Sequence, residues 1–368
     1  MISKDKFNEY VFYISYGCLL SYSLLGQVEA LNTALKLLSA IGVGVIALSL
    51  IIQGRFVSKR QLIYNLLLLC VAAIASYVTG DYSLIKLFLF VIGLKTLNFD
   101  KCVKFDLILR VILMLLVFYL YYLGIAEDSL SYMNRGTVVR HSLGFSNPNS
   151  LGLSIIILCL DILFINKFQF NIRVLLFVPA LVAFSIYYTK SRSALTIAVL
   201  SMILVAVNTA FPEFYRIKLV KKLLTNSFNI GMLLTAILVM LFMRGNSLAE
   251  AMNVFLSDRI YNAVSIISKY CVGIFGMNVS TQKLAVDSIY TYLFIAYGPI
   301  LLLLISFFFK KLFLLLYEYE YRTLIYVLFL FSIYGMSERL WVCIDYNVFI
   351  LMMWLVMNNK PICFNEEI

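Results

Sequence analysis

The chain has 368 residues, of which 62% are hydrophobic and only 13% are charged, and its mean hydropathy is +0.94. Soluble globular domains are about half apolar, so this composition excludes a soluble protein and predicts a polytopic membrane protein. The formal net charge of +11 would suggest nucleic acid for a soluble protein. In a membrane protein the same charge gathers in cytoplasmic loops, so no nucleic-acid partner is expected.

Apolar stretches of about 20 residues, each long enough to cross a bilayer as a helix, recur from end to end. No long polar segment separates them, so we expect one polytopic membrane domain over 1–368, starting with an uncleaved helix. The predicted fold is all-α, with about twelve transmembrane helices at 10–25, 31–52, 61–79, 82–97, 107–125, 148–165, 172–188, 193–211, 227–243, 287–309, 323–336 and 340–357. The even count puts both termini on one side.

Basic residues set the orientation, because cytoplasmic loops carry an excess of lysine and arginine. With a cytoplasmic N-terminus, alternate loops hold most of the basic residues, so both termini are predicted to be cytoplasmic. The outer side still holds nine: Arg135, Arg140, Lys190, Arg192, Arg244, Arg259, Lys269, Lys283 and Arg339. These gain nothing from the cytoplasmic lipid surface, and arginine's planar fork suits phosphate oxygens. An anion on the outer face is therefore the expected ligand.

The outer loop 126–147 is the first place where chemistry is expected. It holds the only histidine and two arginines: Arg135, Arg140 and His141. Asn147 is a good N-cap for the next helix, and Pro148 fits its first position. A helix starting there points its free N–H groups and positive dipole end back toward these basic residues. The corner would suit a phosphate group.

The largest outer loop runs over 244–286. Ser257 or Asp258 can cap a helix there, and four apolar residues then fall on one face: Ile260, Ala263, Val264 and Ile267. This pattern predicts an amphipathic helix at the membrane surface, with Arg259 near its start. Gly273 and Gly276 are expected to end it in a turn. The Gly-Pro pair at 298–299 should kink or break the following span.

Four side chains are candidates for a general base. His141 is preferred, because its unperturbed pKa suits proton transfer near pH 7, although a histidine bonded to a loop neighbour is the alternative. The other three are outer carboxylates, which could equally be helix caps or salt-bridge partners: Asp258, Asp287 and Glu338.

Five arginines are candidate anion ligands: Arg135, Arg140, Arg192, Arg259 and Arg339. The alternative for each is a solvated arginine that snorkels from the end of a span. Ionisable residues inside spans are expected to be functional or paired, among them Lys86, Asp161 and Asp345, of which Asp161 is interpreted as structural.

Familiar catalytic motifs are absent from the sequence. It contains no Walker A loop, no Gly-x-Gly-x-x-Gly fingerprint, no His-Glu-x-x-His and no Gly-x-Ser-x-Gly elbow, and its seven cysteines have no metal-binding spacing. No cofactor and no metal are therefore expected. A reaction here would need an already activated substrate, such as a lipid-linked sugar diphosphate.

Four segments resemble the bacterial polysaccharide polymerases of the Wzy type, in the superfamily that includes the O-antigen ligases. They are Arg-His-Ser-Leu-Gly-Phe-Ser-Asn-Pro-Asn-Ser-Leu-Gly at 140–152, Thr-Lys-Ser-Arg-Ser-Ala at 189–194, the Ser-Asp-Arg, Gly-Ile-Phe-Gly and Asp-Ser-Ile-Tyr pieces within 257–290, and Glu338 with Asn347. They cover the C-terminal two thirds of the chain, and the first five spans carry no motif. Ligases place a histidine in the large outer loop, and 244–286 has none, which favours a polymerase.

The resemblance implies a GT-C-like helical glycosyltransferase in a bacterial cytoplasmic membrane, with its active site facing outward. It implies a polyprenyl-diphosphate-linked oligosaccharide as substrate and membrane lipids as partners, with a chain-length regulator and a flippase of the same pathway as further candidates. Arg140, Arg192 and Arg259 would hold the diphosphate, and three residues would shape the pocket: Asn147, Asn149 and Ser191. A ligase of the same superfamily and a repeat-unit transporter (flippase) remain open as alternatives.

Overall fold

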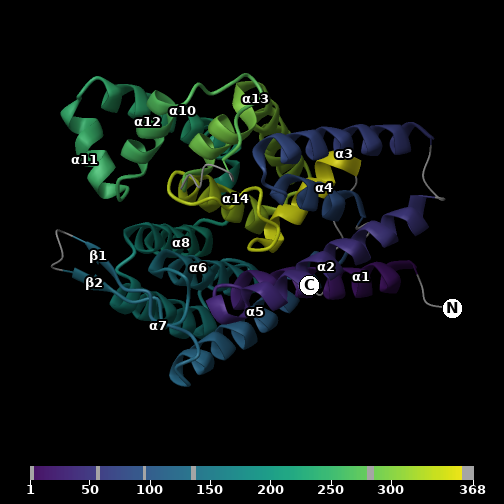
Figure 1. The fold of residues 1–368 in the computed structure, drawn as a ribbon, viewed down its shortest axis with the longest axis horizontal. Helices are drawn as coiled ribbons and strands as arrows, with labels where there is room; N and C mark the ends of the chain where they lie inside the picture. Colours follow the sequence, from purple (N-terminus) through teal and green to yellow (C-terminus); the bar gives the residue numbers. More distant parts are fainter. Residues whose placement is uncertain (1–3, 55–58, 94–96, 134–137, 280–285, 359–368) are drawn as a thin grey trace.

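The computed structural model describes residues 4–54, 59–93, 97–133, 138–279 and 286–358 (Figure 1). These residues form a helical protein with one short hairpin, which confirms the predicted all-α class. The elements are α1 Lys4–Leu25, α2 Glu29–Gly54, α3 Lys59–Thr79, α4 Ser83–Gly93, α5 Phe99–Tyr122, β1 Ser131–Met133, β2 Val138–Arg140, α6 Pro148–Ile165, α7 Ile172–Thr189, α8 Arg192–Ala210, η1 Phe214–Arg216, α9 Lys218–Thr225, α10 Ser227–Met243, α11 Ser247–Phe255, α12 Arg259–Lys269, α13 Ile289–Glu318, α14 Arg322–Tyr334, η2 Val348–Met352 and α15 Met353–Asn358. β1 and β2 pair antiparallel.

Eleven of the twelve predicted spans coincide with a helix, and the predictions 148–165 and 227–243 match α6 and α10 to the residue. Among the described residues, six helices are long and apolar enough to cross a membrane, or seven if the bent pair α9 and α10 counts as one broken span. The helices are thus compatible with a multi-pass membrane protein. The count of twelve spans and the side on which the termini lie stay predictions.

The exception is the last predicted span, because 340–357 is not one helix. The chain makes turns up to Asn347, whose side chain accepts a hydrogen bond from the N–H of Phe349 at 3.1 Å. The segment is apolar because it is buried within the protein. Trp341 is fully buried, and its indole N–H donates to the carbonyl of Phe331 at 3.2 Å. The high hydropathy of this segment therefore reflects its burial within the protein, and the prediction of a transmembrane helix over 340–357 is wrong.

α6 is a central helix of the bundle. Its apolar window is 72% buried inside the protein, against 17% for α2 and α3 and 22% for α7, so it packs against protein where the others present apolar surface outward. Its predicted start is confirmed. The Asn147 side chain accepts a hydrogen bond from the N–H of Ser150 at 2.9 Å, and Pro148 occupies the first turn.

α13 is kinked at Gly298, as predicted from the Gly-Pro pair. Pro299 has no N–H, so the carbonyl of Ile295, four residues earlier, loses its helical donor. The N–H of Met277 takes that place at 3.0 Å. Gly298 has φ +78° and lies so close to Ile274 that a Cβ would sit 2.1 Å from its carbonyl oxygen. The loop before α13 therefore packs directly against the kink.

The turn at Gly273 and Gly276 lies in that loop. Gly276 donates its N–H to the carbonyl of Gly273 at 3.0 Å, which makes the predicted turn. The turn does not end α12, however, because α12 ends at Lys269 and Tyr270 is already extended. The prediction of its role is corrected: these glycines fit the loop against the kink of α13.

Ionisable groups inside the bundle were expected to be either functional or paired, and the structure shows them paired. Arg110 of α5 is fully buried and bonds both carboxylate oxygens of Asp106, the nearer at 2.8 Å, while Asp161 of α6 lies 3.9 Å from the same guanidinium. Lys86 of α4 binds Asp345 at 2.8 Å. Opposite charges placed together reduce the cost of burying each of them.

Candidate functional site

Several polar segments meet at one end of the bundle, which we call the hairpin end. It contains β1, β2, α11, α12 and the turns that follow α14. Figure 1 shows the hairpin and the two short helices α11 and α12 on the same side of the molecule. Direct contacts join these segments: β2 bonds the end of α7, α8 bonds α11, and α12 bonds the segment after α14.

The first turns of α6 and α8 lie side by side at this end. Gly152 of α6 faces Ser191, and a Cβ on the glycine would lie 3.4 Å from the serine Cβ, so a larger side chain would push the two apart. Ser191 caps α8 by accepting from the N–H of Ala194. Both helix N-termini carry the positive end of a dipole, which favours an anion between them.

Arg140 lies beside these two turns and is 9% exposed. Its Nε donates to the carbonyl of Thr189 at 2.6 Å, and its Nη2 donates to the side-chain oxygen of Asn149. Within the described ranges no carboxylate forms an ion pair with it. Burial and the neighbouring guanidiniums of Arg259 and Arg192 lower the pKa of Arg140. Positive charge is therefore crowded here without full compensation.

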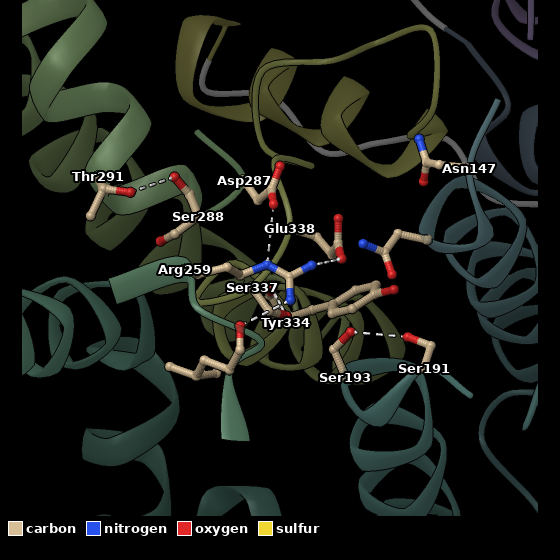
Figure 2. A network of polar contacts seen from close by, with 12 residues as sticks. Asn147, Ser191, Ser193, Arg259, Asp287, Ser288, Thr291, Tyr334, Ser337 and Glu338 are labelled. Atoms are coloured by element: carbon tan, nitrogen blue, oxygen red, sulfur yellow. Dashed lines mark hydrogen bonds and ion pairs between the residues drawn. The ribbon is translucent and has the colours of Figure 1, made fainter. Parts of the chain in front are cut away.

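Arg259 is the first residue of α12 and points into the protein (Figure 2). Its Nη2 binds Glu338 at 2.6 Å, and its Nε lies 3.6 Å from Asp287. That distance is too long for a hydrogen bond, so the buried Nε has no hydrogen-bond partner among the residues described. A left-handed backbone at Ser257 and Asp258 turns the chain between α11 and α12 and sets this direction.

The three arginines share one mode of attachment. Arg192 donates to the carbonyl of Val254 at 2.9 Å, and Arg259 donates to that of Leu256 at 3.2 Å, as Arg140 does to that of Thr189. A carbonyl fixes a guanidinium without neutralising its charge. We call the group formed by Arg140, Arg192, Arg259 and Glu338 the arginine site. It is held in place before any ligand arrives.

Glu338 is the carboxyl group of the arginine site. Its burial raises the pKa to about 7, an effect that Asp287 strengthens and that Arg259 and Arg140 oppose. The group therefore changes its charge near neutral pH, which suits a general base. Tyr334 and Ser193 lie close by in Figure 2, and both line a cavity of about 100 Å³ together with Arg259.

Other predicted site residues lie elsewhere. His141 binds Asp128 at 2.7 Å through Nδ1, and its side chain is 42% exposed. Asp258 occupies the predicted N-cap position of α12, but its side chain makes no capping hydrogen bond, and its carboxylate accepts instead from the side chain of Asn253 at 2.8 Å. Arg339 stacks over Tyr292, 4.4 Å from the ring centroid, in a second cavity. Arg135 lies outside the described residues.

The pocket-shaping predictions can also be placed. Asn149 and Ser191 contact or flank Arg140, as described above, and Asn147 acts as the cap of α6. Sequence reasoning missed the second cavity, in which Asp81 meets Arg339 and Tyr292. Asp81 stands in a short connection between two apolar runs, and nothing in the sequence indicates a partner 211 residues away.

Comparison with protein-family models, with curated proteins and with solved structures finds no match for the chain.

Proposed function

We propose that the chain is a membrane glycosyltransferase of the polymerase and ligase superfamily named above, and that it acts as a polysaccharide polymerase. It transfers a growing glycan from polyprenyl diphosphate to the nonreducing-end hydroxyl of a lipid-linked repeat unit, at the outer face of a bacterial cytoplasmic membrane. The observation that carries the proposal is the arginine site: three arginines anchored by carbonyls, two of which, Arg140 and Arg259, act on one carboxyl group whose pKa is about 7.

The arginines suit the leaving group of this reaction. Breaking the bond between the anomeric carbon and the diphosphate oxygen leaves the electron pair, and thus extra negative charge, on the diphosphate. Arg140, Arg192 and Arg259 present guanidinium groups to that charge, and the first turns of α6 and α8 add their dipoles. Fixed donors aimed at charge that develops in the transition state contribute several kcal/mol, by analogy with about 3 kcal/mol for one oxyanion-hole donor.

Glu338 supplies the base. The acceptor hydroxyl oxygen attacks the anomeric carbon, and Glu338 takes the hydroxyl proton as the bond to the diphosphate breaks. Because Arg259 binds Glu338 at 2.6 Å, a diphosphate that draws Arg259 away removes the cation that lowers the Glu338 pKa. Donor binding would thus make the carboxylate a stronger base. His141, preferred from sequence, is paired with Asp128 and takes second place in this proposal.

An apolar groove beside the arginine site suits the lipid chain. It lies between α7 and α8, has a volume of about 520 Å³, and is lined by residues such as Val182, Ile186 and Ala198. Ile186 is one helical turn from Thr189, whose carbonyl anchors Arg140. A diphosphate bound at the arginine site could therefore lay the start of its polyprenyl chain in this groove.

The test is polymerisation by the purified protein in lipid nanodiscs, supplied with a synthetic polyprenyl-diphosphate-linked repeat and no nucleotide. We expect a ladder of lengthening glycans, and we expect Arg259→Gln to slow its formation by about 100-fold. Arg244 is an exposed arginine at the end of α10, so Arg244→Gln is the matched control and should keep the ladder. Products transferred only to an unrelated acceptor would indicate the ligase reaction instead.

A transporter of lipid-linked repeats is the second candidate, and one observation favours it. Arg110, Asp106 and Asp161 are buried within α5 and α6, and transporters carry ionisable groups inside their bundles. A fluorescent lipid-linked repeat that changes leaflets in proteoliposomes, with no ladder formed, would support the transporter and contradict the polymerase.

A further inference from the structure

A second polar cavity opens on the other side of the segment that holds Glu338. Its volume is about 520 Å³, within the range of small-molecule binding sites. The residues that line it come from α1, α2, α4 and the segments around them, and those that matter here are Tyr22, Lys36, Asp81, Tyr82, Lys86 and Arg339.

The cavity adjoins the arginine site across a single peptide bond. Glu338 and Arg339 are consecutive residues in an irregular stretch, and their Cα atoms are therefore about 3.8 Å apart. The Glu338 side chain binds Arg259, whereas that of Arg339 lies over Tyr292 and 3.6 Å from Asp81. The second cavity is therefore next to the arginine site along the chain, although the two side chains enter different sites.

The charges around the cavity leave one cation uncompensated. Lys86 binds Asp345 at 2.8 Å, and Arg339 faces Asp81. The carboxylate of Asp81 also accepts from the N–H of Ser83 at 2.8 Å and from the Tyr292 hydroxyl. Lys36 lies about two turns into α2 and lines the cavity, and it has no ion pair within the part of the chain that the structure describes.

The rest of the lining suits a sugar. Tyr22 and Tyr82 provide aromatic rings, and the Lys86 ammonium lies 5.9 Å from the centre of the Tyr22 ring. Ser39 and Ser83 add hydroxyl groups. Aromatic faces bind the apolar faces of sugar rings, and hydroxyls and charged groups bind their oxygens. An ammonium group without a partner adds a preference for an acidic ring.

We propose that this cavity binds the acceptor end of the lipid-linked repeat and selects a sugar residue that carries a carboxylate, with Lys36 as its charged ligand. The inference rests on the proposed function and deepens it, because it names the class of acceptor. Lys86 and Arg339, which are paired with carboxylates, would stabilise the structure of the cavity, and Lys36 would bind the carboxylate of the substrate.

The experiment uses two soluble trisaccharides that differ in one group, a glucuronate residue and its carboxyl-reduced glucose counterpart. Their affinities for the full chain in nanodiscs are measured by titration calorimetry without any donor. We expect the glucuronate compound to bind about 10-fold more tightly, the effect of one charge-assisted hydrogen bond. Lys36→Gln should remove the preference, and Lys36→Glu should reverse it.

The matched control is Lys190→Gln, which changes an exposed lysine at the end of α7 that stacks on Tyr187 and should keep the preference. Equal affinities in the wild type, or an unchanged preference in Lys36→Gln, would overturn the inference. A ladder in the polymerisation assay without the binding preference would overturn only the acceptor site. A preference without a ladder would support the glycan cavity and contradict the polymerase.

Discussion

The arginine site and the second cavity lie on either side of the Glu338–Arg339 peptide bond and hold most of their cations in different ways. In the arginine site, Arg140 and Arg192 are held by backbone carbonyls, which leave the positive charge in place, and only Arg259 also has a carboxylate partner, Glu338. In the second cavity, Lys86 and Arg339 are held by carboxylates, which cancel it.

This difference in charge compensation suits the two sites to two different kinds of ligand. Uncompensated guanidinium groups attract a ligand with several negative charges, such as a diphosphate. A cavity whose charges are mostly paired binds a ligand with few charges, and it selects by shape and by the one free cation. Under the proposed function, the contrast favours the arginine site for the donor lipid and the second cavity for the glycan acceptor.

The largest expected effect concerns Glu338, which stands between the two. Glu338→Gln keeps the shape but removes the base, so we expect transfer to slow by about 10³-fold, within the range for general bases. A pH profile adds a sharper test, because the base must be deprotonated and its pKa is about 7. The wild-type kcat/KM, which reports the free enzyme, should therefore fall as pH drops below 7, and the residual kcat/KM of the variant should lose this dependence. A profile unchanged by the substitution would contradict the assignment.

The next effect compares an arginine from each region. Arg259→Gln should lower kcat by about 100-fold, because it removes a fixed donor to the leaving diphosphate. Arg339→Gln should mainly raise KM for the acceptor, by less than about 5-fold, since Arg339 is a partly exposed partner of Asp81. Steady-state kinetics with donor and acceptor varied separately would check both. Equal losses of kcat in the two variants would contradict the assignment of different roles to the arginine site and the second cavity.

A smaller effect is expected from Arg140→Lys. Lysine keeps the charge but has no planar fork, so it cannot bond the carbonyl of Thr189 and Asn149 and still offer a phosphate a second N–H. We expect about a 10-fold loss of donor affinity. Titration with a polyprenyl diphosphate that carries no sugar would measure it, and wild-type affinity would show that only the charge matters.

The smallest effect should come from His141→Gln. The ring pairs with Asp128, which also accepts from the N–H of Ser142 at 2.7 Å, so the histidine supports the loop after β2. We expect less than about a 3-fold change in rate, as for most exposed pairs. A loss as large as that of Glu338→Gln would return His141 to the role of base.

Much of the fold was readable from the sequence because apolar length and helix caps are local. The start of α6 at Asn147 and Pro148 and the kink at Gly298 were predicted from neighbouring residues alone. The segment after α14 was not, because its hydropathy reflects burial around Trp341 and its turns depend on Asn347.

The site was readable only in part. The arginines predicted to lie on the outer side were recognisable as a group, and Arg140 is close enough to Arg259 and Arg192 for their charges to lower its pKa. Which carboxylate joins them could not be predicted, since Arg259 and Glu338 are 79 residues apart and their contact depends on how the helices pack. For the same reason the sequence favoured His141, whose partner Asp128 is visible only in the folded hairpin.

The central claim is that the arginine site binds the donor and that Glu338 starts the transfer. The most direct measurement compares the wild type and Glu338→Gln in nanodiscs, for binding of sugar-free polyprenyl diphosphate and for ladder formation from lipid-linked repeats. The account predicts that both proteins bind the lipid diphosphate and that only the wild type produces a ladder. A ladder formed by Glu338→Gln at the wild-type rate would contradict it.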